Sequence, residues 1–230
     1  MTKLLVSRTD KIQEYVLEEV DEYTTVLEAL LWVRENRDPT LAFRYSCRMG
    51  LCGSCSMEIN GRPRLACQTR LSDLQEKVSI RPLRGYQVVK DLVPDLTNFF
   101  ERYSSVKPYL LRDDKVEQEN PSAPYTQIPE NVEDYLQFNY CIQCGICFSA
   151  CPVTREDPNY LGPAALNVAY RYTKDSRDLG FEQRTQLVDI PHGIWECRVE
   201  SLCSEYCPKG VDPSLAIQKY KSIILRKGRV

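Results

Sequence analysis

Cysteine is the residue type in this chain whose number and spacing best indicate chemistry. All eleven cysteines of the 230 residues fall into three groups, and none lies outside them. Thiolates at such spacings bind iron–sulfur clusters, which carry single electrons. The start, MTKLLVSRTDKIQEY, turns charged before an apolar stretch develops, so we expect no export signal. Without an export signal, the protein is expected in a reducing compartment, where clustered cysteines bind metal more often than they form disulfides. An odd number of cysteines also cannot all pair as disulfides.

The first group has the spacing C-x4-C-x2-C with a fourth cysteine after eleven more residues, and consists of Cys47, Cys52, Cys55 and Cys67. This is the plant-type pattern of a [2Fe–2S] cluster. Gly50 and Gly53 permit a close approach of the backbone, so we expect N–H groups to face the sulfurs. Cys67 is expected to close the site from the strand beyond a hairpin turn. A zinc site is the alternative, but zinc sites usually use paired C-x2-C knuckles, and Cys67 has no such mate.

The second group has the bacterial ferredoxin spacing C-x2-C-x2-C-x3-C-P and consists of Cys141, Cys144, Cys147 and Cys151. In that motif the first three cysteines hold one cluster and the fourth ligates another, which requires a second run. The run CRVESLCSEYCPKG supplies it with the third group, Cys197, Cys203 and Cys207. This run is an internal repeat of the motif, with Glu200 in the place of one cysteine.

Counting thiolates across the repeat predicts two different clusters. A [4Fe–4S] cluster takes four ligands, predicted to be Cys141, Cys144, Cys147 and Cys207. The remaining three, Cys151, Cys197 and Cys203, suit a [3Fe–4S] cluster. With one thiolate fewer, there is less negative charge around that cluster. Its reduction potential should therefore be higher than that of a comparable cluster with four thiolates. Alternatively, the Glu200 carboxylate holds a fourth iron and makes this a second [4Fe–4S] cluster.

The elements that position the first group have an α+β pattern. We expect strands at 4–7, 15–20, 56–59, 64–67 and 77–80, with a hairpin turn at Asn60-Gly61. Thr25 and Glu28 form a capping-box pair that predicts a helix over 26–35. Leu96, Phe99, Phe100 and Tyr103 share one helical face and are expected to pack together.

The C-terminal part is predicted to be helical around the cysteine runs. Residues 106–130 have the prolines and charges of a linker. One helix begins at Pro163, with Ala165, Val168, Ala169 and Tyr172 on one face. The last helix follows Asp212-Pro213, buries Ala216, Tyr220, Ile223 and Ile224, and has Gly228 as a plausible C-cap. Its basic end suits a helix C-terminus or docking on a partner or anionic lipid.

Bulk properties exclude several function classes. A net charge of -2 provides no basic field for nucleic acid. No stretch of about 18 apolar residues exists that could cross a membrane. No catalytic triad, phosphate loop or dinucleotide fingerprint occurs. We therefore expect this polypeptide to have no substrate site of its own.

The order of the three motifs, together with RYSCRMGLCGSC, YLGPAALNVAYRY and CSEYCPKGVDP, resembles the iron–sulfur subunit family of succinate dehydrogenase and fumarate reductase over nearly the whole chain. The resemblance implies a β-grasp [2Fe–2S] ferredoxin-like domain (1–105), a linker (106–130) and an all-α helical ferredoxin domain (131–230). It also implies a FAD-containing flavoprotein partner, membrane anchor subunits and a quinone. Electrons would pass between flavin and quinone through the three clusters. The expected location is the cytoplasmic side of the inner (cell) membrane, peripheral through these partners.

Some residues near the third group depart from the ubiquinone-using members of that family. Those members have aromatic residues shortly after the Cys151-Pro152 position, where this chain has 153–156 as VTRE, and a histidine at the position of Arg198. Of the positions that contact the quinone in those members, only Pro152 has the same residue in this chain. This favours menaquinone or a soluble acceptor over ubiquinone. Trp195 is expected either to pack in the core or to line an acceptor pocket. The single histidine, His192, is interpreted as structural or surface, with proton delivery as the alternative.

Three other functions compete with the leading one. The first is the iron–sulfur subunit of a related flavoenzyme with a soluble thiol or hydroxy-acid couple. The second, from another class, is a zinc-stabilised interaction module. The third is a stand-alone ferredoxin.

Overall fold

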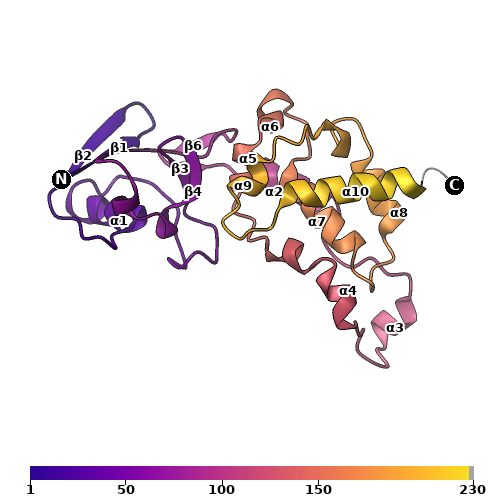
Figure 1. Ribbon diagram of the computed structural model, residues 1–230. Coiled ribbons are helices and arrows are strands. Elements are labelled where there is room, and N and C mark those ends of the chain that lie inside the picture. The colour runs from indigo at the N-terminus through magenta and orange to yellow at the C-terminus, as the bar shows by residue number, and fades with distance from the viewer. Residues whose placement is uncertain (228–230) are drawn as a thin grey trace. The chain divides into compact units, whose positions relative to one another are not determined.

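The N-terminal segments with alternating apolar residues form a five-stranded mixed sheet in the computed structural model, which describes residues 1–227 (Figure 1). The strands are β1 (Thr2–Ser7), β2 (Ile12–Leu17), β3 (Ser56–Ile59), β4 (Arg62–Leu65) and β5 (Lys77–Arg81), in the order β2-β1-β5-β3-β4. The β1–β5 pair is parallel and the other pairs of this sheet are antiparallel. Gly228, the expected C-cap, lies outside the described residues.

The chain divides into two units, which we call the first and the second unit. Met1–Leu96 and Ile142–Ala150 make the first unit, and Thr97–Cys141 with the described residues from Cys151 onward make the second. The first unit therefore includes a short segment with two cysteines of the second group. The predicted α+β class, with a mixed sheet followed by helices, is confirmed.

The helix α1 (Val26–Asn36) begins at the predicted capping box. The Thr25 hydroxyl accepts from the Glu28 amide at 3.2 Å, and the Glu28 carboxylate accepts from the Thr25 amide at 2.7 Å. The amide of Val26 also donates to the Thr69 carbonyl at 2.8 Å. The start of α1 is thereby joined to the residues that directly follow Cys67.

Two of the strand predictions need correction. The second strand is β2 (Ile12–Leu17) and not 15–20, because its register with β1 pairs Ser7 with Ile12 and Thr2 with Leu17. The strand predicted over 64–67 ends at Leu65, and Ala66–Gln68 forms the 3-10 turn η1. The Thr69 hydroxyl closes this turn by donating to the Leu65 carbonyl at 3.0 Å. Cys67 therefore lies on a turn and not on a strand.

Further short elements complete the first unit. They are η2 (Leu71–Asp73), β6 (Val88–Lys90), β7 (Val93–Pro94) and α5 (Ile146–Ala150). Between β6 and β7, the buried Asp91 carboxylate accepts from the amides of Thr9 at 3.1 Å and Ala42 at 3.0 Å, and it pairs with Arg8 at 3.0 Å. Asp91 thus holds the segment that leads into the first cysteine group.

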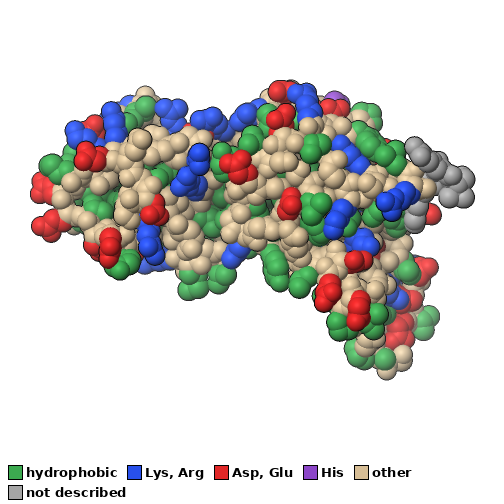
Figure 2. Space-filling view, viewed as in Figure 1, with side chains coloured by type: hydrophobic (Ala, Val, Ile, Leu, Met, Phe, Trp, Pro, Cys, Tyr) green, Lys and Arg blue, Asp and Glu red, His purple; other side chains and the backbone are tan. Residues whose placement is uncertain are grey.

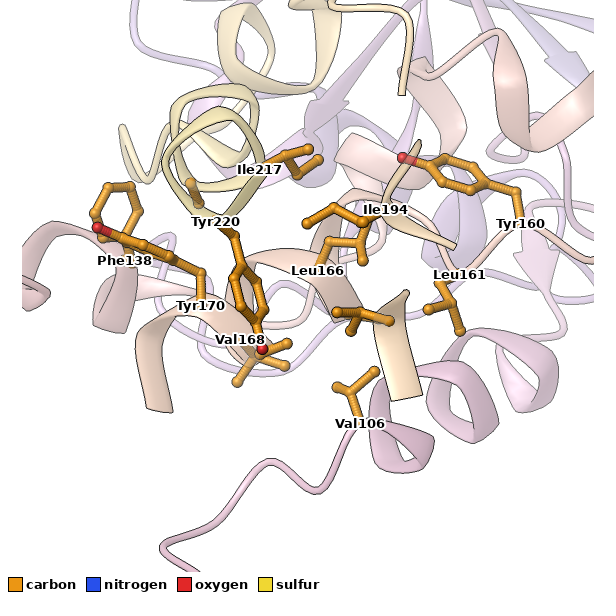
Figure 3. Close-up of a cluster of buried hydrophobic side chains, with 14 of the residues drawn as sticks. Val106, Phe138, Tyr160, Leu161, Leu166, Val168, Tyr170, Ile194, Ile217 and Tyr220 are labelled. Atoms are coloured by element: carbon orange, nitrogen blue, oxygen red, sulfur yellow. The ribbon is translucent and has the colours of Figure 1, made fainter. Parts of the chain in front are cut away.

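The second unit is helical and its core lies between α7 (Pro163–Thr173) and α10 (Pro213–Lys227) (Figure 3). The other helices and turns are α2 (Thr97–Ser105), α3 (Lys115–Glu119), α4 (Pro129–Glu133), η3 (Leu136–Tyr140), α6 (Val153–Glu156), α8 (Phe181–Val188), η4 (Ile194–Glu196) and α9 (Leu202–Glu205). Tyr220 of α10 and Tyr170 of α7 lie in this core, with ring centroids 6.2 Å apart. The predicted stripes of both helices face this core, with Tyr172, Ile223 and Ile224 only partly buried against it.

The predicted stripe of α2 is only partly correct. Phe99 is buried, and Tyr103 packs against the core of the second unit. Phe100 is 42 % exposed, because adjacent helical residues point about 100° apart and only one of the two phenylalanines can face the core.

The proline-rich segment 106–130 is bound to the second unit. The Arg184 guanidinium, which is fully buried, pairs with Asp178 at 2.9 Å and donates to the Tyr109 carbonyl at 3.1 Å. The Leu111 amide donates to the same aspartate at 2.9 Å. The division at 105 and 130 stays a prediction.

Basic side chains lie along α10 (Figure 2). Two of them also make internal contacts: the Lys221 ammonium donates to the Cys197 carbonyl at 2.9 Å, and the Lys219 ammonium lies 5.5 Å from the Phe138 ring centroid. From Met1 to Lys227, none of the helices combines the length and the apolar character needed to cross a bilayer.

We predict that Asp91→Asn destabilises the protein by about 1.5–3 kcal/mol, the range for hydrogen bonds to a charged group. Burial by itself would raise the pKa of Asp91, but hydrogen bonds from the Ala42 amide and from Arg8 outweigh it and lower the pKa. A lowered folded-state pKa gives stability that is complete above the unfolded value of about 3.9 and is lost as the pH falls through the folded value. The loss caused by the substitution should therefore be constant from pH 8 to pH 5 in thermal denaturation of the holoprotein.

The exposed Asp10 provides the control, and Asp10→Asn should leave the melting temperature unchanged. A difference between wild type and Asp91→Asn that has disappeared by pH 5 would contradict the lowered pKa.

Candidate metal centres

The loop of the first cysteine group turns its backbone amides toward sulfur. The Sγ atom of Cys47 accepts from the amides of Met49 at 3.5 Å, Leu51 at 3.3 Å and Cys52 at 3.3 Å. The loop can do so because Arg48, Gly50 and Gly53 have φ angles of 59°, 72° and 71°. The expected N–H groups around the sulfurs are therefore present, and they fit a negatively charged iron–sulfur cluster.

The four thiols of this group have contrasting surroundings. Cys52 is exposed, whereas Cys55 and Cys67 are buried. Burial opposes ionisation of Cys52, but hydrogen bonds from Ser54 and from the Cys47 amide outweigh it and lower its pKa to about 6. Burial raises the pKa of Cys55 to about 12. The Cys55 thiol would therefore release its proton only in exchange for a bound cation.

The segment with Cys144 and Cys147 packs directly against this loop within the first unit. The Ser56 hydroxyl donates to the Cys144 carbonyl at 2.7 Å, and the Tyr86 hydroxyl donates to the Gly145 carbonyl at 3.0 Å. A Cβ atom on Gly53 would lie 2.6 Å from the Cβ atom of Cys144. Sequence reasoning missed this contact, because 88 residues separate Ser56 from Cys144 and no local pattern reports on such a pairing.

The internal repeat is visible in the backbone. Cys141 follows the turn η3 with φ −64° and ψ 119°, and Cys197 follows η4 with φ −63° and ψ 116°. The residues two and four positions later have positive φ in both runs: Gln143 (55°) and Gly145 (77°), then Val199 (62°) and Ser201 (57°). Glu200 therefore occupies the same backbone environment as Cys144, as the sequence predicted for the missing thiolate.

Three cysteines predicted to act together line one cavity of the second unit. They are Cys151, Cys197 and Cys203, and the same cavity is lined by Pro152, Val153, Tyr160, Glu200 and Ile217, among others. Burial raises the pKa of Cys203 to about 12 and also raises that of Cys151. Cys203 is buried, and Cys151 and Cys197 are half-buried. Thiols around a common space fit a cluster that is bound as iron replaces the protons. Glu200 itself is exposed.

Tyr160 also lines this cavity, although no sequence motif marks it as a functional residue. Its side chain is only 1 % exposed, and Figure 3 shows it among the buried residues of the second unit. Burial raises the pKa of Tyr160 well above its usual range, and the three nearby cysteines raise it further. Its hydroxyl therefore keeps its proton and can act as a hydrogen-bond donor.

The other residues selected near the third group have different positions. Pro152 lines the cavity of the three cysteines, whereas Trp195 is not among the residues that line it. The core-packing interpretation of Trp195 is wrong: the ring is 43 % exposed, and its Nε1 donates to Asp189 at 2.6 Å. His192 is a surface residue whose Nδ1 lies 2.7 Å from the Asp157 carboxylate. Arg198 pairs with Glu156.

The predicted [4Fe–4S] ligands are divided between the two units. Cys144 and Cys147 belong to the first unit, and Cys141 and Cys207 belong to the second. The Val211 amide donates to the Cys207 sulfur at 3.4 Å. This ligand set stays a prediction from the sequence. In residues 1–227, no three His, Cys, Asp or Glu side chains are arranged to hold a single metal ion.

Comparisons with known proteins agree with the two kinds of site. A 2Fe-2S iron-sulfur cluster binding domain matches residues 5–101, and a 4Fe-4S dicluster domain matches residues 137–211. The fumarate reductase iron-sulfur subunit of Mycobacterium tuberculosis is 46 % identical over 197 residues, which cover 85 % of this chain and 79 % of the relative. That of Haemophilus influenzae is 39 % identical over 87 % of this chain and 82 % of the relative.

The chain belongs to the succinate dehydrogenase/fumarate reductase iron–sulfur subunit family. A solved structure agrees: a chain of the Mycobacterium smegmatis Sdh1 complex in the apo form is 28 % identical, with a TM-score of 0.88, over 100 % of this chain and 97 % of that chain. The predicted family and iron–sulfur cofactors are confirmed, and the cysteines of the third group fit a [3Fe–4S] cluster. Membership of an iron–sulfur subunit family does not support the alternative function as a zinc-stabilised interaction module.

We predict that Gly53→Ala disrupts the first site and displaces the Cys144 segment, because the new Cβ would overlap the Cys144 backbone at 2.9 Å. The matched control is Gly61→Ala, which has a similar φ of 77° but no atom closer than 4.0 Å. Both variants lose about 1–2 kcal/mol to backbone strain. Only Gly53→Ala should also lose iron and acid-labile sulfide from the purified protein. Equal iron contents in the two variants would contradict the proposed contact.

Proposed function

We propose that this chain is the electron-transfer subunit of a succinate dehydrogenase or fumarate reductase complex. The observation that carries the proposal is the cavity shared by Cys151, Cys197 and Cys203, in a chain that also has an amide-lined loop around Cys47. Bound clusters would supply one-electron chemistry between a flavin and a quinone. The chain itself supplies ligands, hydrogen-bond donors and walls that exclude water.

The proposed ligand sets follow the three groups. Cys47, Cys52, Cys55 and Cys67 would hold [2Fe–2S]. Cys141, Cys144, Cys147 and Cys207 would hold [4Fe–4S]. Cys151, Cys197 and Cys203 would hold [3Fe–4S]. We assign the plant-type domain to 1–105, the linker to 106–130 and the helical domain to 131–230.

The proposed partners are a FAD-containing flavoprotein subunit and membrane anchor subunits, which would hold this chain peripherally at the cytoplasmic side of the inner (cell) membrane. The names of the relatives, iron–sulfur subunits of fumarate reductase and a chain of an Sdh1 complex, support a place in a multisubunit oxidoreductase. Menaquinone is the proposed quinone. Pro152 lies at the cavity of the third group, and the neighbouring Arg198 pairs with Glu156 in place of a free histidine. Oxidation of added menaquinol and ubiquinol analogues by the purified complex would test this preference.

We predict that single cysteine substitutions remove clusters separately. In the purified complex, Cys203→Ala should abolish the narrow, nearly isotropic low-temperature EPR signal of the oxidised protein, which is typical of [3Fe–4S]. It should leave the [2Fe–2S] signal of the reduced protein in place. Cys52→Ala should do the reverse, because each thiol is needed as a ligand at only one site. Each variant thus serves as the control for the other, and loss of both signals in both variants would contradict separate sites.

We predict that Glu200→Gln leaves the EPR signals and the iron content unchanged. Glu200 is exposed at the cavity, and a solvated carboxylate can be replaced by an amide at little cost. If the carboxylate instead held a fourth iron, wild type would lack the oxidised [3Fe–4S] signal and the glutamine variant would gain it. That pattern would assign a second [4Fe–4S] cluster.

A further inference from the structure

The cavity of Cys151, Cys197 and Cys203 has a buried tyrosine in its wall that is not a proposed ligand. Tyr160 lines this cavity, and its side chain is 1 % exposed. Its carbonyl accepts from the Arg102 guanidinium at 2.7 Å, and its neighbour Leu161 donates to the His192 carbonyl at 3.0 Å. The backbone on both sides of the ring is therefore fixed, and the ring cannot easily turn out of the cavity.

A buried tyrosine hydroxyl needs a partner, since an unpaired one loses its hydration without compensation. Tyr160 shares its cavity with Cys151, Cys197 and Cys203. These three cysteines add to the effect of burial in raising the pKa of the Tyr160 hydroxyl, Cys197 most among them. The two serines that line the cavity, Ser201 and Ser214, bond each other through their hydroxyls at 3.2 Å, and Glu200 is exposed. Val153, Pro163 and Ile217 in the same lining are apolar. Sulfur is therefore the acceptor that the fold offers to this hydroxyl.

We propose that Tyr160 is a positioning residue for the cluster of the third group. The Tyr160 hydroxyl donates a hydrogen bond to sulfur at this site and thereby raises the reduction potential of the cluster. The inference rests on the proposed [3Fe–4S] assignment. Hydrogen bonds to the sulfurs and low solvent exposure are among the factors that set cluster potentials. A donor stabilises the more negative, reduced state more than the oxidised state, and in a cavity of low polarity this difference is larger than in water.

The test is Tyr160→Phe in the purified complex, with redox titration of the oxidised [3Fe–4S] EPR signal. The substitution removes the hydroxyl and keeps the ring. At a fixed potential near the midpoint, the ratio of oxidised to reduced cluster should rise about three- to tenfold, and tenfold corresponds to about 59 mV for a one-electron couple. The [2Fe–2S] midpoint in the same sample should not move.

Tyr220→Phe is the matched control. Tyr220 is also buried in the core of the second unit, but its hydroxyl bonds the hydroxyls of Thr173 at 3.2 Å and Thr185 at 3.3 Å. Its removal should leave the midpoint unchanged. An unchanged midpoint in Tyr160→Phe, or an equal shift in both variants, would overturn the proposal.

A second variant covers the case in which Tyr160→Phe does not retain its cluster. Incorporation of 3-fluorotyrosine at position 160 keeps both ring and hydroxyl and makes the hydroxyl a stronger donor, so the midpoint should rise. A midpoint that stays constant or falls would overturn the proposal. If the wild-type complex itself has no oxidised [3Fe–4S] signal, the cluster assignment fails, which is a different outcome from a signal that does not shift.

Discussion

A cluster held by thiolates is negatively charged, and a protein can hold that charge away from water only by supplying hydrogen-bond donors. In the first unit the donors are backbone amides, three of which point at the Cys47 sulfur. A loop of this shape does not persist alone, because it requires positive φ at Arg48 as well as at two glycines. The Asp91 carboxylate binds the Ala42 amide and so fixes the segment that leads into the loop. The Val26 amide binds the Thr69 carbonyl and fixes the chain after Cys67.

The first and third cysteine groups each lie within a single unit, and they supply hydrogen-bond donors to sulfur in different ways. The first is partly open, with Cys52 exposed and amides as donors. In the third, none of the three cysteines is exposed, Cys203 is buried, and a buried tyrosine lines the cavity. Exposure and the donors at the sulfurs both affect reduction potential. Differences in potential between clusters along one chain can therefore arise from local burial as well as from the number of thiolates.

The cysteine groups could be predicted because ligand spacing is a local property of the chain. The capping box of α1 and the buried faces of α7 and α10 were predictable for the same reason. The contact of Ser56 with Cys144 and the place of Tyr160 were not, since both depend on residues far apart in sequence. The strand expected at Cys67 was wrong because a side-chain hydrogen bond from Thr69 closes a turn there, which strand propensity does not report.

The third group retains the loop shape of a four-ligand run although its second ligand is replaced. Val199 has a φ of 62°, a conformation in which a β-branched residue is strained by about 1–2 kcal/mol. Such strain persists only where the surroundings determine the backbone, and it occurs most often at functional sites. In the second run the equivalent position is Gln143, also with positive φ. The strained valine therefore supports the proposal that the loop between Cys197 and Cys203 encloses a cluster that has one thiolate ligand fewer than a four-cysteine run supplies.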